Sequence, residues 1–512
     1  MNTKHNVFSG FGLTALALAS SLGLGGLSAC DDGGTTVPDE QPPVEAPVEE
    51  PVEEARVYPD PPPPTEQRPV NFPELQMFEL PNKLKVYVVE NHEVPMVDVQ
   101  VVVKAGTIYD DLVADMTAQM LTEGTKKRSK AKIDETIEQV GSSLGASAGL
   151  HNAFVSTRVL TPNLKLALDL VNDVVQNPKF EQEALDKLKE QQKVAIKGEK
   201  SSGASLAQRL MGKLLYPEGH PFAPDFPTDA EIDAVTPDTL RQFHTTWYQP
   251  GNAYVILSGD VTLEGVKKNV EKTLGRWVPG SEFPGHPLEK FAASDYSAAL
   301  PTEMAVHIID RNQISSDIII GNVNGVARNS PDWLKMNAMT KLFGGGMSSR
   351  LFRDIRESKE LTYNIGAFQA PQKVVGAFAI VTQTKKTDEM LTALFGHMDD
   401  IRSAEPTDQE FQAAVDNMAL SFPLQIETAG QVASKVRTML TYNLPEDYYD
   451  KYIENVRAIT KADIKSMAEK NVAAVPVIVI VGKAAKIKKQ LKDVEVLADA
   501  KIYEYDADLN PV

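Results

Sequence analysis

The sequence is poor in the residues that mark several large classes of protein. Its 512 residues include one cysteine, Cys30, which excludes an internal disulfide framework and a thiolate metal cluster. Basic residues are outnumbered, with 52 Lys and Arg against 70 Asp and Glu, and the formal net charge is −18. Because nucleic-acid binding needs a basic surface, we expect no nucleic-acid partner. The acidic balance is compatible with a cationic or neutral peptide ligand.

Closely spaced histidines and long apolar stretches are also absent, which makes a zinc site and a transmembrane helix less expected. No two histidines lie within five residues of each other, so no histidine pair could hold zinc on one helical turn. The eight histidines are His5, His92, His151, His220, His244, His286, His307 and His397. After residue 30 the chain has no stretch of about 18 uncharged apolar residues, so we expect no transmembrane helix.

The first 30 residues have the pattern of a secretion signal, because Lys4 and His5 precede a short run of small and apolar residues. The run ends at Ala29 and Cys30, which resembles the bacterial lipoprotein box. That resemblance implies cleavage before Cys30 and acylation of its thiol. The product would be a lipoprotein anchored to a membrane of the cell envelope and facing the periplasm. An ordinary signal peptide with a chance cysteine is the alternative.

Residues 31–69 contain eleven prolines and clustered glutamates. Such a segment buries too little apolar surface to offset its ordering entropy, so we expect a disordered linker. Beyond it, strand and helix patterns predict an α+β fold whose antiparallel sheets carry helices on one face. The expected strands cover residues 84–89, 97–103, 255–257, 305–309, 318–320 and 477–481, and the expected helices cover residues 114–121, 133–144, 164–175, 181–196, 333–343, 390–401 and 409–422.

Two local matches indicate an internal duplication. Residues 235–240 resemble residues 459–464, and Gly259 after its strand resembles Gly482 after its own. The offsets, 460 − 236 = 224 and 482 − 259 = 223, are nearly equal. We therefore predict two homologous repeats of about 220 residues each. They would cover residues 70–285 and 300–505, joined by a Pro- and Gly-bearing segment at residues 279–301.

Residues 112–125 resemble the helix that carries the inverted zinc motif H-x-x-E-H of insulinase-type peptidases. In that register Asp115 and Gln119 stand at the two histidines and Ala118 stands at the glutamate. The family's third ligand, a more distant glutamate, falls near residues 194–196, which offer no carboxylate. Alanine cannot act as a base and glutamine is a poor zinc ligand, so we expect no metal site in this chain.

The resemblance covers nearly all of residues 75–500, and a second family signature at residues 343–363 is intact. There the family has an arginine and, seven residues later, a tyrosine that complete the active site, and Arg356 and Tyr363 have that spacing. The resemblance implies that both donate hydrogen bonds to the substrate and to the oxyanion of the reaction. The alternative is a solvated arginine and a core tyrosine.

Two further segments belong to the expected cleft. Gly344, Gly345 and Gly346 lack the Lys-Ser/Thr pair of a phosphate loop, so we expect a flexible turn at the cleft mouth. Residues 146–157 resemble the strand on which family members bind substrate by strand addition. An ordinary sheet edge would have the same composition.

The resemblance implies half of a clamshell and a non-catalytic role. A homologous subunit with H-x-x-E-H would hold the zinc, and this chain would supply Arg356 and Tyr363 to a peptide or unfolded polypeptide. No cofactor is then expected in this chain itself. The alternatives are a scaffold of the same fold for peptide binding or assembly, and an autonomous metallopeptidase that would retain tightly bound zinc.

Overall fold

The structure is a computed structural model that describes residues 70–280, 283–291, 296 and 301–512. The signal-like segment, Cys30 and the Pro/Glu-rich segment 31–69 lie outside the described residues. In the part that the structure describes, none of the helices has the length and apolar character needed to cross a membrane.

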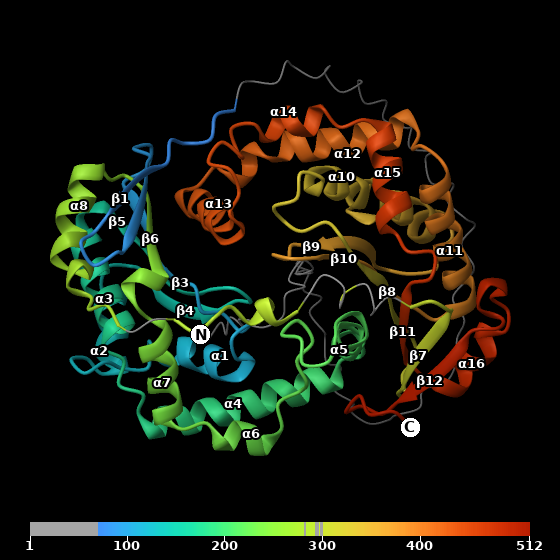
Figure 1. Ribbon diagram of the computed structural model, residues 1–512, viewed down its shortest axis with the longest axis horizontal. Coiled ribbons are helices and arrows are strands. Elements are labelled where there is room, and N and C mark those ends of the chain that lie inside the picture. Colours follow the sequence, from blue (N-terminus) through green and yellow to red (C-terminus); the bar gives the residue numbers. More distant parts are fainter. Residues whose placement is uncertain (1–69, 281–282, 292–295, 297–300) are drawn as a thin grey trace, which may run out of the picture. The chain divides into compact units, whose positions relative to one another are not determined.

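Two six-stranded sheets organise the described chain (Figure 1). The first sheet has the strand order β1-β2-β6-β3-β5-β4, and the second has the order β12-β7-β11-β8-β10-β9. The strands are β1 (Gln76–Glu79), β2 (Lys85–Glu90), β3 (Met96–Val103), β4 (Leu144–Ala148), β5 (Ala153–Leu160), β6 (Ala253–Gly259), β7 (Ala305–Asp310), β8 (Ser316–Asn324), β9 (Ile365–Ala370), β10 (Gly376–Thr384), β11 (Val477–Gly482) and β12 (Lys501–Tyr505). The predicted α+β class is confirmed, although three strand pairs, β2 with β6, β7 with β11 and β7 with β12, are parallel.

The two sheets correspond strand by strand. The run β2-β6-β3-β5-β4 matches β7-β11-β8-β10-β9 in order and in the relative direction of neighbouring strands. The outer strands differ, because β1 is antiparallel to its neighbour and β12 is parallel to its own. Thr236 and Thr460 cap equivalent helices with capping boxes, and Gly259 and Gly482 end equivalent strands. Both sequence matches therefore fall on equivalent positions of a duplicated unit.

Helices cover one face of each sheet. In the first half, α1, α3 and α8 pack on the strands, and in the second half α10, α15 and α16 do so. The helices are α1 (Asp111–Met120), α2 (Lys130–Glu138), α3 (Leu164–Gln176), α4 (Gln182–Ser201), α5 (Gly203–Leu215), α6 (Asp229–Ala234), α7 (Pro237–Trp247), α8 (Leu263–Lys272), α10 (Trp333–Gly344), α11 (Thr387–Ser403), α12 (Asp408–Ser421), α13 (Ala429–Tyr442), α14 (Tyr452–Arg457), α15 (Lys461–Asn471) and α16 (Ala484–Leu491).

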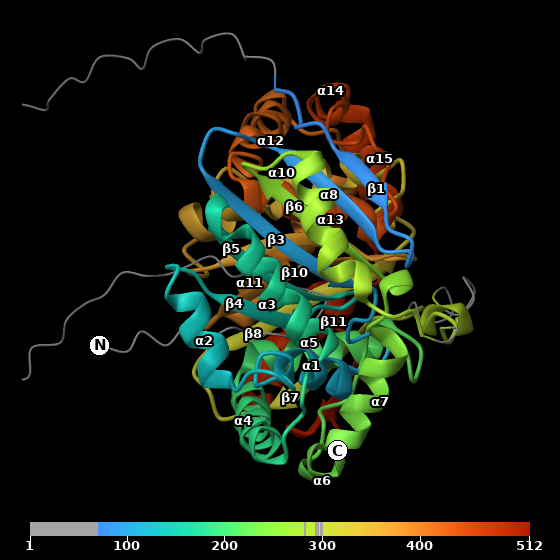
Figure 2. The ribbon, with the colours of Figure 1, turned by 90° about the vertical axis from the view of Figure 1, so that its left-hand side faces the viewer.

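The opposite face of each sheet is covered by a helix from the other half of the chain (Figures 1 and 2). Helix α5 packs on β8 and β11, and helix α13 packs on β3 and β6. Val436 of α13 lies in one buried cluster with Val102 and Ile256 of the first sheet. Strands covered on both faces read as continuous apolar runs, and β6, β8 and β11 are buried at every position. From the sequence we expected helices on one face only, because the helices of the other half were not assigned to a sheet.

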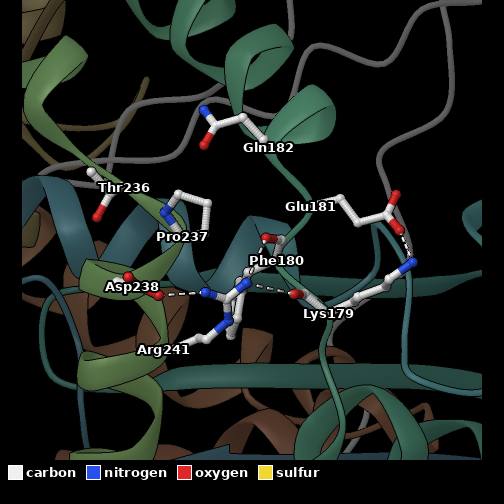
Figure 3. A pocket seen from close by; sticks show the side chains of 8 residues that line it. All are labelled: Lys179, Phe180, Glu181, Gln182, Thr236, Pro237, Asp238 and Arg241. Carbon is white, nitrogen blue, oxygen red and sulfur yellow. Dashed lines mark hydrogen bonds and ion pairs between the residues drawn. The ribbon is translucent and has the colours of Figure 1, made fainter.

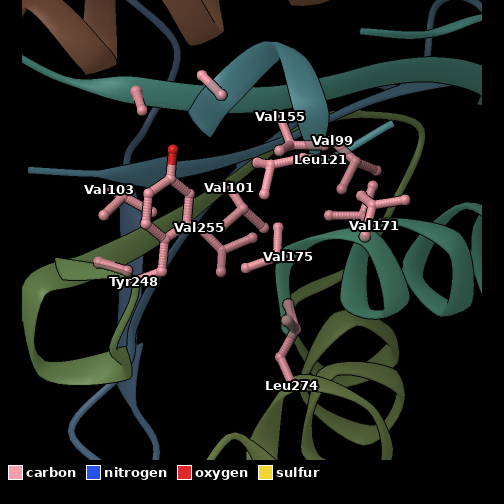
Figure 4. Close-up of a cluster of buried hydrophobic side chains, with 14 of the residues drawn as sticks. Val99, Val101, Val103, Leu121, Val155, Val171, Val175, Tyr248, Val255 and Leu274 are labelled. Carbon is pink, nitrogen blue, oxygen red and sulfur yellow. The ribbon is translucent and has the colours of Figure 1, made fainter. Parts of the chain in front are cut away.

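The main core of the first half lies between its sheet and its own helices. Figure 4 shows Val101 and Val255 from the strands packed with Val171 and Val175 from α3. Tyr248, at the C-terminal end of α7, is buried in the same cluster. This packing fixes the side of the sheet on which α1 and its degenerate zinc motif lie.

Two expected elements differ from the structure. The helix predicted at residues 133–144 ends at Glu138, because Gly141 adopts a left-handed φ of 70° and the chain then enters β4. The strand predicted at residues 146–157 is a hairpin, in which β4 and β5 pair across a turn at residues 149–152. The strand at the edge of the sheet is therefore β4, because β5 lies between β4 and β3.

Candidate functional site

The degenerate zinc motif lies on α1, which Asp110 caps by accepting a hydrogen bond from the Val113 amide. Residues 115, 118 and 119 then project from neighbouring turns of one helix. Asp115 Oδ2 accepts a hydrogen bond from Gln119 Nε2 at 2.7 Å. Ala118 is fully buried in the core. The aspartate and the glutamine that replace the two histidines therefore bind each other.

A third residue, which no pattern in the sequence indicates, joins this pair. Gln192 Nε2 on α4 donates to Asp115 Oδ2 at 3.0 Å. The expected position of the distant ligand was residues 194–196, but Val194 is 68% exposed and points away from the core. Helix α4 is one uninterrupted helix, so side chains two residues apart lie on different faces, and Gln192 faces α1 whereas Val194 does not. Asp115, Gln119 and Gln192 form what we call the amide–carboxylate cluster.

Burial dominates the electrostatics of this cluster. It raises the pKa of Asp115 to about 6, while the two amide donors oppose the rise. Burial, aided by Asp115, also raises the pKa of the neighbouring Asp111 to about 6, against the pull of Arg209. Asp115 Oδ1 and the Tyr248 hydroxyl are both buried without a hydrogen-bond partner. The cluster thus keeps one carboxyl in a weakly solvated place.

These residues do not fit a zinc ion. Zinc sites in proteins use Cys, His and carboxylate ligands, and the cluster offers one carboxylate and two amides. Both amides direct N–H groups at the carboxylate oxygen that a metal would need. Within residues 70–512, as far as they are described, no group of three or more His, Cys, Asp or Glu side chains could hold a metal ion.

Arg356 and Tyr363 lie together in the second half. Arg356 belongs to a π-helical turn at Phe352–Ser358, a conformation that is frequent at functional sites. Its guanidinium lies 4.4 Å from the Phe352 ring centroid and 5.4 Å from that of Tyr363. The Tyr363 side chain is 91% exposed, so it is not the core tyrosine of the alternative interpretation. Both groups keep hydrogen-bond donors open to a ligand.

The glycine run has a packing role. A Cβ on Gly344 would lie 2.5 Å from the Ala367 backbone nitrogen in β9, and one on Gly345 would lie 2.6 Å from Lys341 Cα. Gly346 has a φ of 148°, which L-residues rarely adopt. Gly344 therefore permits close contact of α10 with β9, and Gly345 lets the chain pass close to Lys341 at the end of α10. The expected flexible turn stays a prediction for Gly346 and the residues after it.

The structure does not bring the two predicted groups together within this chain. Among the described residues, neither Arg356 nor Tyr363 has a hydrogen bond, ion pair or ring contact with Asp115, Ala118 or Gln119. Each half of the family's active site thus lies in its own repeat.

A surface pocket elsewhere does not compete as a candidate site. It lies where α4 and α7 begin, and its charged side chains are already paired (Figure 3). Lys179 pairs with Glu181, and Arg241 pairs with Asp238. Arg241 also donates to the backbone carbonyls of Lys179 and Phe180, so the pocket ties two helix starts together.

Comparisons with known proteins agree with this description. Residues 85–211 match the family described as insulinase, peptidase family M16, and residues 234–418 match the family described as peptidase M16 inactive domain. A relative named non-peptidase homolog YmxG, from Helicobacter pylori, is 23% identical over 75% of this chain and 88% of its own length. An uncharacterized zinc protease of Streptomyces coelicolor is 23% identical over 64% of this chain and 70% of its own.

Solved structures share the fold. The crystal structure of a peptidase M16 inactive domain from Pseudomonas fluorescens superposes with a TM-score of 0.70, at 24% identity, over 80% of this chain and 98% of that one. A protease from Helicobacter pylori superposes with a TM-score of 0.67, at 17% identity, over 80% of this chain and 99% of that one. The two family matches together cover more than half of the sequence. The chain therefore belongs to the insulinase (M16) peptidase family, as a non-catalytic homologue.

Proposed function

We propose that this chain is the non-catalytic subunit of a two-chain zinc peptidase. A homologous partner with an intact H-x-x-E-H motif would hold the zinc, and this chain would contribute Arg356 and Tyr363 to the shared site. The observation that carries the proposal is the exposed pair itself: Tyr363 is 91% exposed and Arg356 lies beside it. A pair that served only this chain's stability would be buried or bound to a carboxylate.

The chemistry assigned to the pair follows from its donors. Attack on a peptide carbonyl builds negative charge on the carbonyl oxygen, and the partner's zinc would supply the Lewis acid. The Arg356 guanidinium and the Tyr363 hydroxyl can donate hydrogen bonds to that oxygen and to the substrate backbone. Their ring contact, at 5.4 Å, keeps the two side chains oriented together. Losing one such donor typically lowers kcat by about 100-fold or more.

The substrate and the location belong to the same proposal. Among the described strands, β4 is the last of its sheet and has one unpaired side, on which an extended peptide could add as a further strand. Acylation at Cys30, with residues 31–69 as a spacer, would hold the complex on a membrane of the cell envelope. The ligand would be a peptide or an unfolded polypeptide.

The test is to mix the purified chain with a homologous H-x-x-E-H protein of the same organism and to measure hydrolysis of an unstructured peptide. We expect the mixture to exceed both separate proteins, and we expect Arg356→Ala and Tyr363→Phe to lower kcat. Arg353→Ala is the matched control, because Arg353 is an exposed residue of the same π-helical turn. If mixing gives no gain with any such partner, the scaffold interpretation replaces the proposal.

A further inference from the structure

Four basic residues lie near one another at one end of the first sheet, although the protein as a whole is acidic. Lys104 follows β3, His151 lies in the β4–β5 turn, His286 lies in the segment that joins the halves, and Lys373 lies in the β9–β10 turn. In the described part of the chain, no Asp or Glu forms an ion pair with any of them. We call these four residues the basic cluster.

Contacts around Tyr442 hold the two turns side by side. The Tyr442 ring lies edge-on to the His151 ring, with centroids 5.6 Å apart. Its hydroxyl donates to the Pro371 carbonyl at 2.7 Å, which ties down the start of the turn that carries Lys373. Next to His151, Asn152 Nδ2 donates to Thr441 Oγ1 at 2.6 Å. The end of α13 therefore fixes the β4–β5 turn against the β9–β10 turn.

The other side of the cluster is fixed by the loop before α1. A Cβ on Gly106 would lie 2.2 Å from the Gly149 carbonyl oxygen, so this loop packs directly on the β4–β5 turn. The loop ends at Tyr109, whose ring lies 5.5 Å from that of His286. The carboxylate that acts on His286 is that of Glu289, three residues later.

The charges in the cluster act on one another. Burial and the ammonium of Lys373 lower the pKa of His151 to about 3. Burial and the ammonium of Lys104 lower the pKa of Lys373 to about 8. His151 is 5% exposed, and neither of its ring nitrogens has a hydrogen-bond partner. Repulsion between the exposed Lys104 and the partly buried Lys373, together with the unpartnered buried imidazole of His151, raises the free energy of the unliganded protein.

We propose that the basic cluster of Lys104, His151, His286 and Lys373 is a binding site for a carboxylate group of a polypeptide ligand. A carboxylate would accept charge-assisted hydrogen bonds from the two ammonium groups and would relieve their repulsion. His151 lies three residues after β4 ends at Ala148, so a chain added to that edge strand would pass beside the cluster. The two lysines make the cluster positively charged, although the net charge of the protein is −18. A positively charged site favours an acidic ligand.

This inference goes beyond the proposed function, because it concerns the isolated chain and needs no zinc-bearing partner. The probe is a fluorescein-labelled unstructured peptide with two adjacent glutamates, compared with the same peptide carrying glutamines. Each is made with a free and with an amidated C-terminus. Fluorescence anisotropy on the full-length chain measures Kd at low and at high salt.

We expect the glutamate peptide to bind more tightly than its glutamine form, and its affinity to fall as salt rises. If amidation alone weakens binding, the carboxylate is the chain terminus; if Glu→Gln does so, it is the side chain. The double variant Lys104→Gln and Lys373→Gln should raise Kd about tenfold or more. Lys268→Gln, at an exposed lysine of α8, should leave Kd unchanged.

Equal binding of the glutamate and glutamine peptides with free and amidated ends would overturn the proposal, as would an unchanged Kd in a folded double variant. Circular dichroism of each variant checks the fold. If the peptides bind as expected but mixing with a zinc-bearing partner gives no hydrolysis, the carboxylate site is supported and the proposed function is not. If mixing gives hydrolysis but the peptides bind equally, the proposed function is supported and the carboxylate site is not.

Discussion

Gln192 on α4 donates a hydrogen bond to Asp115 on α1 across 3.0 Å, and this contact joins the two helices that would carry the zinc ligands in an active relative. Gln119 donates to the same oxygen at 2.7 Å. Three side chains from these two helices thus converge, as one carboxylate that accepts hydrogen bonds from two amides.

Restoring the ligands should restore metal binding. The triple variant Asp115→His, Gln119→His and Gln192→Glu places two imidazoles and a carboxylate where the cluster now lies, so we expect about one tightly bound zinc per chain by metal analysis. The double variant that keeps Gln192 should bind zinc at least about tenfold more weakly, since it lacks the third ligand. Neither should hydrolyse peptides, because Ala118 supplies no base. A folded triple variant without zinc would show that α4 does not hold the third position.

The buried carboxyl should make stability depend on pH. The pKa of Asp115 rises from 3.8 to about 6 on folding, so its protonated form favours the native state below pH 4, and that contribution is lost as the pH rises through 6. Asp115→Asn stays neutral, so its free energy of unfolding, relative to the natural protein, should rise by up to about 3 kcal/mol between pH 4 and pH 8. Urea denaturation at several pH values measures this difference. Asp186→Asn, at an exposed carboxyl of α4, should give a flat difference.

Much of the fold and part of the site could be predicted from the sequence. The predictable features depend on local sequence, and the others depend on contacts between distant residues. The repeat matches at Thr236 and Thr460 fall on helix caps, where one side chain and one backbone amide decide the local structure. Periodicity likewise places α10 and β11. Each of the helices α5 and α13 packs on the sheet of the other half. This could not be predicted, because the apolar face of a helix does not indicate which sheet it covers. The role of Gln192 could not be predicted for the same reason, because its contact with Asp115 joins residues far apart in the chain.

The glycine run should be sensitive to a single methyl group. Gly344→Ala would place a Cβ 2.5 Å from the Ala367 nitrogen, against backbone that cannot move cheaply, so we expect a loss of about 1–3 kcal/mol in the free energy of unfolding. Gly396→Ala is the control, because Gly396 lies inside α11 with nothing within 4 Å of the new Cβ. It should stabilise the protein by about 0.5–1 kcal/mol. Equal effects of the two changes in urea denaturation would contradict the packing role of Gly344.

Because each half contributes a helix, α5 or α13, that covers the sheet of the other half, the two halves should unfold as one unit. Val436 of α13 is fully buried with Val102 and Ile256 of the first sheet, although α13 belongs to the second half of the chain. Val436→Ala should therefore lower the free energy of unfolding by about 2 kcal/mol through lost burial and a residual cavity. Val194→Ala, at a valine that is 68% exposed, should change it by less than about 0.5 kcal/mol. Calorimetry should show one transition in both variants, because each sheet loses a covering helix when the other half unfolds. Two separate transitions in the natural protein would mean that α5 and α13 do not couple the unfolding of the two halves.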